Sequence, residues 1–221
     1  MYKKAFTMSE VLITIGIIGV VAAMTLPGVI QGYKKKQTEV HLQKVYTILS
    51  QAFMQSQLKN GEYASWGQGF DMGAEEYFKI YWEPYLQKVI YCKTYDQCGY
   101  KSNKPWFLNN GTAYDYSVEI NDYRAPFILS DGTFISVSTG GGIDSTFSEN
   151  LINVDLNAGG MPNKLGIDLF VFVRTENGLI KPYGYDKTDD YINDECRQTG
   201  RTCAELIVRS GWKINKNYPW R

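Results

Sequence analysis

The chain opens MYKKAFTMSEVLITIGIIGVVAAMTLPGVI (Met1–Ile30), the stretch that says most about its fold. A short basic head precedes an apolar run, and one carboxylate, Glu10, lies just inside that run. A carboxylate inside a membrane segment costs free energy, roughly 2.5–3.5 kcal/mol at the bilayer centre and less near its edge. Glu10 is therefore the first candidate for a functional residue.

Val11–Ile30 holds 20 residues and no charged side chain. A helix needs about 20 apolar residues to cross a bilayer, so this apolar segment is long enough to span one. Pro27 cannot donate a backbone hydrogen bond, which predicts a kink or local loosening of the helix there. Two lysines precede the segment and Lys34–Lys36 follow it, so loop charge alone does not favour a cytoplasmic N-terminus.

The order Lys3-Lys4-Ala5, then Phe6-Thr7-Met8-Ser9-Glu10, then an apolar helix resembles the N-terminal segment of type IV pilins and of type II secretion pseudopilins. It departs from the usual family pattern at Ala5, where glycine is common, and at Met8, where leucine is frequent. The resemblance implies that a prepilin peptidase cuts between Ala5 and Phe6 and that Phe6 is then N-methylated.

The same resemblance gives Glu10 a role in assembly. It implies that the Glu10 carboxylate pairs with the N-terminal amine of a neighbouring subunit, which makes two buried charges less costly than either alone. The implied partners are other copies, other pilin-like subunits, the prepilin peptidase and methyltransferase, and an inner-membrane assembly platform. The implied location is the cytoplasmic membrane, with a cytoplasmic N-terminus and an extracytoplasmic head, and then a pilus or pseudopilus.

The sequence predicts four parts: a leader over residues 1–5, a transmembrane and filament-core helix over 6–30, its amphipathic continuation over 31–60, and a globular head over 61–221. The apolar side chains of the continuation recur at three- and four-residue spacing, which predicts one helical face packed on a domain. They are Leu42, Val45, Tyr46, Leu49, Ala52 and Phe53. Asn60-Gly61 is a reasonable end for the helix.

The head is expected to be α+β, with an antiparallel sheet packed on the long helix and a short C-terminal helix, which is the pilin-like lollipop. Ser130-Asp131-Gly132 between apolar runs predicts a hairpin. The predicted strands are 113–120, 126–129, 133–137, 151–156, 168–174 and 179–183. We expect a helix over 73–90, interrupted by Pro84, and a capping box from Thr202 to Glu205 that starts the last helix.

The four cysteines form two local couples, Cys92 with Cys98 and Cys196 with Cys203. An even number of cysteines in an exported chain favours disulfides, and we expect these two local pairs. Each closed loop contributes roughly 2–2.5 kcal/mol through loop entropy. Structural zinc usually uses tighter Cys-x2-Cys units, and redox catalysis uses Cys-x-x-Cys, so neither is favoured.

The loop from Asp155 to Asp168 is a candidate calcium site. Asp155, Asn157 and Gly160 occupy the first, third and sixth positions of a calcium-binding loop, but Gly166 stands where the twelfth-position glutamate is expected. The predicted ligands are Asp155, Asn157 and Asp168, with Asp144 and Glu149 able to add oxygens only if their loop folds nearby. The alternative is a turn in which Asp and Asn cap local amides.

Composition narrows the function classes. The chain has 23 basic and 23 acidic residues, so no net charge points to nucleic acid. Its only histidine, His41, is expected at a surface or interface, and no nucleophile or phosphate motif indicates an enzyme. A structural filament subunit is the leading hypothesis. The alternative is a filament-tip or membrane-anchored binding module that uses the tyrosine-rich loops and the Cys92–Cys98 segment.

Overall fold

The computed structural model describes residues 7–121, 123–140 and 150–220. The chain divides into two compact units, Met1–Gln37 and Thr38–Arg221, and we call the second the head unit. One helix, α1 (Met8–Asn60), contributes its first part to the first unit and its second part to the head unit. The end predicted at Asn60-Gly61 is confirmed, because α1 ends just before Gly61, whose φ is +87°.

The second part of α1 packs through one face, as its apolar spacing predicts. Its buried residues recur every three or four positions: Glu39, Leu42, Val45, Leu49, Ala52, Phe53 and Ser56. Phe53 is at the centre of an aromatic group, 5.8 Å from the Trp82 ring and 5.4 Å from the Trp66 ring between centroids. This face of α1 is thus part of the core of the head unit.

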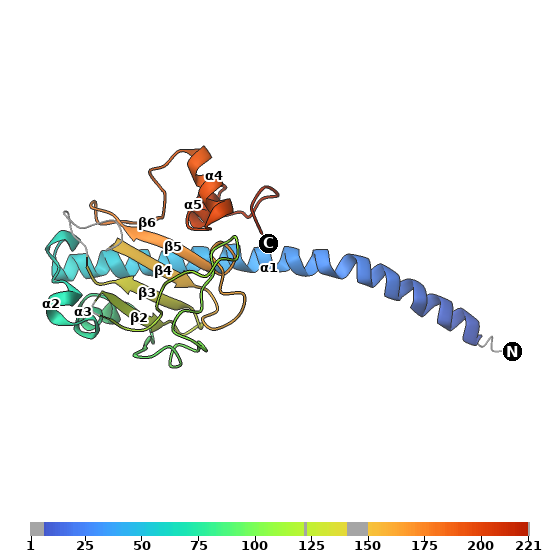
Figure 1. Cartoon of the computed structure of the whole chain (residues 1–221), viewed down its shortest axis with the longest axis horizontal. Helices are drawn as coiled ribbons and strands as arrows, with labels where there is room; N and C mark the ends of the chain where they lie inside the picture. The colour runs from blue at the N-terminus through green and yellow to red at the C-terminus, as the bar shows by residue number, and fades with distance from the viewer. Residues whose placement is uncertain (1–6, 122, 141–149, 221) are drawn as a thin grey trace. The chain divides into compact units, whose positions relative to one another are not determined.

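A six-stranded antiparallel sheet follows in simple chain order, β1 to β6 (Figure 1). The strands are β1 (Ile90–Tyr91), β2 (Arg124–Ile128), β3 (Phe134–Ser138), β4 (Leu151–Asp155), β5 (Leu169–Arg174) and β6 (Ile180–Pro182). The predicted β2–β3 hairpin is confirmed, with Phe127 opposite Ile135. In Figure 1 the second part of α1 runs behind the sheet.

Both faces of the sheet are covered, which explains why every residue of β5 is buried. Phe170 and Phe172 join the cluster that contains the buried face of α1. Leu169 and Val171, which alternate with them, join a second cluster with the irregular segment 92–118, which we call the loop layer. Alternation along a strand sends successive side chains to opposite faces, so a single strand serves both clusters.

Two predicted elements in the middle of the chain are wrong. Residues 113–120 form no strand. Their backbone forms hydrogen bonds with earlier residues of the loop layer and not with the sheet: Tyr114 N donates to Trp106 O at 2.8 Å and Val118 N to Asn103 O at 2.9 Å. The helix predicted over 73–90 is shorter. It comprises α3 (Ala74–Tyr81) and a 3-10 turn at Glu83–Tyr85, and β1 begins at Ile90. The short helix α2 (Gly69–Met72) and the 3-10 turn Tyr63–Ser65 precede it.

The C-terminal region holds two helices, α4 (Asp189–Gln198) and α5 (Cys203–Arg209), of which only the second is predicted. The predicted capping box is wrong. The Thr202 hydroxyl donates to the carbonyl oxygen of Ile192 at 2.7 Å, and Glu205 accepts from Arg209 Nε at 2.7 Å. A long helix, an antiparallel sheet and short C-terminal helices nevertheless make the α+β, pilin-like arrangement that the sequence predicts.

Candidate functional site

The start of α1 is closed by a reciprocal capping box between Thr7 and Glu10. The Thr7 backbone N–H and hydroxyl both donate to Glu10 Oε2 at 2.8 Å, and the Glu10 N–H donates to Thr7 Oγ1 at 3.2 Å. Two backbone donors at the helix end are satisfied in this way. Sequence reasoning missed this role of Glu10, although the Thr-x-x-Glu spacing that signals it is present.

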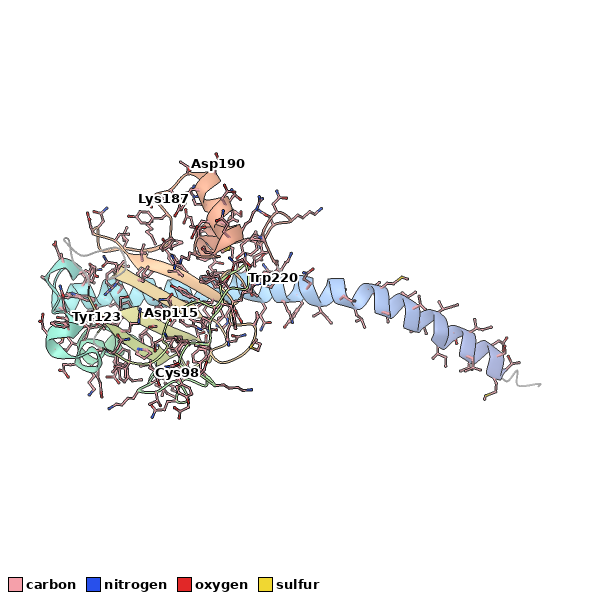
Figure 2. The ribbon with its side chains drawn as sticks, in the orientation of Figure 1. Cys98, Asp115, Tyr123, Lys187, Asp190 and Trp220 are labelled. Carbon is pink, nitrogen blue, oxygen red and sulfur yellow. A yellow bond between two sulfur atoms is a disulfide. The ribbon has the colours of Figure 1, made fainter. Side chains whose placement is uncertain are left out.

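The apolar segment that follows has no partner inside its own unit. Its large side chains are exposed, for example Ile17 at 60% and Ile18 at 64% (Figure 2). Its mean hydropathy is 2.2 over the most apolar window, and by length and composition it can cross a membrane. Such a surface in water would be unfavourable, so the segment fits a membrane-anchored protein with a single crossing.

Three predicted features of this region stay predictions. Ala5 and Phe6, the proposed cleavage and methylation sites, lie outside the described residues. Pro27 stands inside α1, which is helical on both sides of it, and no measured feature tests a kink there. The orientation of the crossing also has no structural test.

The predicted calcium loop lies between β4 and β5, and Asp155 at its start is fully buried. Asp155 Oδ2 accepts from Tyr100 OH at 2.8 Å and from Trp106 Nε1 at 3.1 Å. Burial first, and then the neighbouring Asp168 carboxylate, raise the pKa of Asp155 well above its usual range. An ionised Asp155 is therefore costly without a positive charge nearby.

Asp168 lies close to Asp155 but its oxygens are directed into its own loop. Its two oxygens accept from the backbone N–H of Asn163 at 2.9 Å and of Lys164 at 2.7 Å. Burial raises the pKa of Asp168, although these backbone bonds act in the opposite direction. Asp168 thus organises the loop, and a hydrogen bond from the Asn157 side chain also acts on its carboxylate. The predicted ligand set stays a prediction, and Asp144 and Glu149 lie outside the described residues.

Sequence reasoning missed three residues at this loop. Tyr100 and Trp106, far away in sequence, donate to the Asp155 carboxylate, and only the loop layer brings them there. Asn163 is 5% exposed and adopts a left-handed φ of +54°, which asparagine tolerates better than most residues. Over residues 7–121, 123–140 and 150–220, no group of three or more His, Cys, Asp or Glu side chains could hold a metal.

Both expected disulfides are present, and they lie in different parts of the head unit. Cys92–Cys98 closes a turn in the loop layer. Cys98 is labelled in Figure 2. Cys196–Cys203 joins α4 to α5. All four cysteine side chains are fully buried.

Three large aromatic residues of the loop layer are core residues, although Phe107 in the same layer is 38% exposed. Trp106 stacks on Tyr116 with 4.8 Å between ring centroids, and Trp106, Tyr100 and Tyr116 are at most 4% exposed. The Arg124 guanidinium lies 4.0 Å from the Tyr116 ring centroid and covers it. These rings are therefore unavailable for the surface contacts that the binding-module hypothesis assigns to this region.

Comparison with known proteins gives two family matches. Residues 1–26 match the prokaryotic N-terminal methylation motif, and residues 28–221 match a family of unknown function, DUF6613. No curated protein and no solved structure matches the chain. The methylation motif identifies the prepilin-type segment that the first residues resemble, as in type IV pilin-like proteins, whose members are structural subunits rather than enzymes. The chain therefore belongs to the family of unknown function DUF6613 and carries a prepilin-type N-terminal segment in front of it.

Proposed function

We propose that this protein is a structural subunit of a type IV pilus-like or type II secretion pseudopilus filament. A prepilin peptidase cuts it between Ala5 and Phe6, Phe6 is N-methylated, and subunits assemble through Glu10. The observation that carries this proposal is the N-terminal methylation motif over residues 1–26, which includes most of an apolar helical segment with exposed side chains. In a filament, neighbouring apolar segments bury these side chains against one another.

The proposed assembly contact is a pairing between two charges. Cleavage frees a positive amine on Phe6, and methylation keeps that charge. A carboxylate in an apolar environment is strongly stabilised by such a partner. Glu10 is the only charged side chain from Phe6 to Ile30, so no other residue of the segment offers this pairing. The capping contact with Thr7 supports the proposal because it places the carboxylate at the first turn of α1.

The proposed partners and location follow from the same role. The precursor sits in the cytoplasmic membrane with its N-terminus toward the peptidase, and the head unit lies on the far side, where disulfides form. Lys34–Lys36 then meet the lipid head groups at the end of the apolar segment. Other copies, pilin-like subunits and the assembly platform are its proposed partners.

The first test is the intact mass and N-terminal sequence of protein recovered from cells. The proposal expects a mature chain that starts at methylated Phe6. An uncut Met1, or a cut near Ala23, would contradict it and leave an anchored or secreted domain. The same experiment on an Ala5→Gly variant should give at least as much mature chain, because glycine is the usual residue before the cut.

The second test separates the charge of Glu10 from its capping role. Glutamine keeps the reciprocal hydrogen bonds of a capping box, so Glu10→Gln removes the charge alone. The matched variant Thr7→Ala removes the cap and leaves the charge. We expect Glu10→Gln to stay in the membrane fraction and to lose most filament assembly, and Thr7→Ala to assemble. Normal filament levels with Glu10→Gln would rule out charge pairing as the assembly contact.

A further inference from the structure

A groove of about 400 Å³ lies in the head unit between the second part of α1, residues 85–87 and the turn of the β2–β3 hairpin. We call it the amide groove, because Gln51, Gln55 and Gln87 line it. Its volume is within the range of small-molecule binding sites, roughly 300–1,000 Å³. The chemistry of its lining therefore decides what it can hold.

The polar groups of the amide groove have no partners. All three glutamines are exposed, and within the described part of the chain neither their amides nor the Ser130 hydroxyl, which also lines the groove, form a hydrogen bond. Gln51 and Gln55 are four residues apart on α1, so their side chains lie on the same side of the helix. Each primary amide offers two donors and an acceptor oxygen. The groove thus presents donors and acceptors side by side that are available to a ligand.

The floor of the amide groove is aliphatic and held in place by the core. Leu86 and Leu129 are 9% and 6% exposed, and Ile48 is half-buried against the same core cluster. The Tyr85 hydroxyl accepts from Asn60 Nδ2 at 3.0 Å, which fixes its ring beside the groove. A ligand would therefore meet a preformed apolar surface, and little free energy would be lost in ordering it.

The lining of the amide groove carries no net charge. Lys44 and Asp131 are the two ionic residues that line it, and they form an ion pair with 2.8 Å between Nζ and Oδ2. The other oxygen of Asp131 accepts from the Thr133 hydroxyl at 2.8 Å. An anionic ligand would find the cation already paired, and a cationic ligand would find the carboxylate already paired. The lining therefore favours a neutral ligand that is rich in hydrogen-bonding groups.

A second groove of the head unit has a different chemistry. It has about 250 Å³ and lies between α4, α5 and the residues that follow α5. Its amides already have partners: Asn215 Nδ2 donates to Ser210 Oγ at 3.2 Å, and Asn193 Nδ2 donates to the Asp189 carbonyl oxygen at 2.8 Å. Those amides stabilise the local structure, whereas the amides of the amide groove remain available.

An acetamido group fits amides that stand beside an aliphatic floor. Its N–H and its carbonyl oxygen can each pair with a glutamine amide, and its methyl group can pack on the leucine side chains of the floor. A peptide group has the same polar atoms, but extended peptides are commonly bound through main-chain hydrogen bonds to the edge of a sheet. None of the residues that line the amide groove belongs to a strand. The lining therefore favours a saccharide with acetamido groups over a peptide.

We propose that the amide groove binds an N-acetylated saccharide, and that Gln51, Gln55 and Gln87 form hydrogen bonds with its acetamido and hydroxyl groups. The Ser130 hydroxyl can bond a further hydroxyl of the sugar. The site goes beyond the proposed filament role, because it lies in the head unit and uses neither Phe6 nor Glu10. Saccharide binding and filament assembly can therefore fail independently of each other.

Isothermal titration calorimetry of the full-length protein in detergent tests the proposal with two matched sugars. Chitotetraose carries an acetamido group on each ring, and cellotetraose has a hydroxyl in its place on the same backbone. We expect chitotetraose to bind at least roughly tenfold more tightly, which is the effect of one or two hydrogen bonds. N-acetyl-tetraalanine amide, which offers amide groups without sugar rings, should not bind.

Glutamine-to-leucine variants test the contacts, because leucine removes the amide and keeps a side chain of similar size. Binding of chitotetraose should weaken roughly tenfold in Gln51→Leu and in Gln87→Leu. Gln43→Leu is the matched control, since Gln43 is exposed on the same helix and does not line the groove. It should bind chitotetraose as the wild type does. All three positions are exposed, so the Tm measured without sugar should be that of the wild type.

Three results would overturn the proposal. The first is the absence of any heat of binding with chitotetraose up to about 10 mM. The second is equal affinity for cellotetraose or for the alanine peptide, because the groove would then not recognise an acetamido group on a sugar. The third is wild-type affinity in both Gln51→Leu and Gln87→Leu, which would place the sugar elsewhere on the head unit.

Discussion

The apolar segment and the sheet core of the head unit are both rich in large apolar side chains, yet their environments are opposite. Ile17 and Ile18 of the apolar segment are about three-fifths exposed, while Phe170 and Phe172 of β5 are fully buried. The head unit satisfies its apolar surface within one chain, and the apolar segment does not. The difference teaches that the same kind of side chain builds a core in one region and fits a membrane anchor in the other. The proposed function adds burial against neighbouring segments in a filament.

The strongest way to break this comparison is a pair of matched truncations. Phe172→Ala should lower the free energy of unfolding of the head unit by about 3–5 kcal/mol, because it leaves a cavity between the sheet and α1. Ile17→Ala should change that free energy by less than about 0.5 kcal/mol, since the Ile17 side chain is 60% exposed. Urea unfolding followed by tryptophan fluorescence, in detergent, measures both. A comparable loss in both variants would mean that the two regions share one core.

Removing one disulfide should have an effect of intermediate size on the unfolding free energy of the head unit. Replacing Cys196 and Cys203 together by serine should lower the unfolding free energy by roughly 2–2.5 kcal/mol, because the short loop is no longer closed in the unfolded chain. The double variant should still fractionate with membranes as the wild type does, since anchoring depends on the apolar segment alone. Loss of the protein from the membrane fraction, with the chain intact, would contradict that separation.

The smallest expected effect concerns the ion pair that fastens α1 to the β2–β3 hairpin. Lys44 Nζ donates to Asp131 Oδ2 at 2.8 Å. Partial burial acts to raise the pKa of Asp131, but hydrogen bonds from Lys44 and Thr133 and the charge of His41 hold it well below the usual range. Lys44 is 56% exposed, so solvent screens the pair and Lys44→Met should cost only about 0.5 kcal/mol at neutral pH.

The stabilisation by the Lys44–Asp131 ion pair should depend on pH in one direction. A carboxylate with a depressed folded-state pKa stabilises the fold above its unfolded value of about 3.9, and the gain is lost as the pH falls through the folded value. The difference between Lys44→Met and wild type should therefore shrink below about pH 4. Lys216→Met, at an exposed position, is the control. A difference that grows on acidification would show that Asp131 does not carry it.

Sequence patterns predicted the elements that rest on repetition. The three- and four-residue spacing of Leu42, Val45 and Leu49 predicted the buried face of α1. The Asp-Gly turn predicted the hairpin of β2 and β3, and the cysteine spacing predicted both disulfides. In each case the cause is local, so neighbours in sequence were sufficient.

Two Thr-x-x-Glu sequences show where local patterns fail. The one at Thr7 forms the reciprocal box, and both of its side chains bond within the same helical turn. The one at Thr202 does not, because its hydroxyl donates to a carbonyl of α4 and Glu205 pairs with Arg209. Tertiary partners decide which of two equal signals is used, and they are invisible in the sequence.

The missed elements have similar causes. Helix α4 buries only Ile192 and Cys196, so its polar composition hides the helical period. Residues 113–120 alternate like a strand, and Tyr116 and Val118 are indeed buried, but their backbone bonds go to the loop layer. At the candidate calcium loop, sequence reasoning named Asp155, Asn157 and Asp168. It missed Tyr100 and Trp106, which donate to Asp155, because they are far away in the sequence.

The second part of α1 is held to the head unit at several levels along its length. Glu39 accepts from a backbone N–H of the C-terminal segment at 2.8 Å, the Tyr46 hydroxyl donates to the Ile180 carbonyl at 3.1 Å, and Gln57 donates to the Gly178 carbonyl at 2.9 Å. A tensile load applied along this helix acts on these bonds in shear and on all of them at once. The load is thus shared among these bonds along the second part of α1 and is not carried by one of them alone.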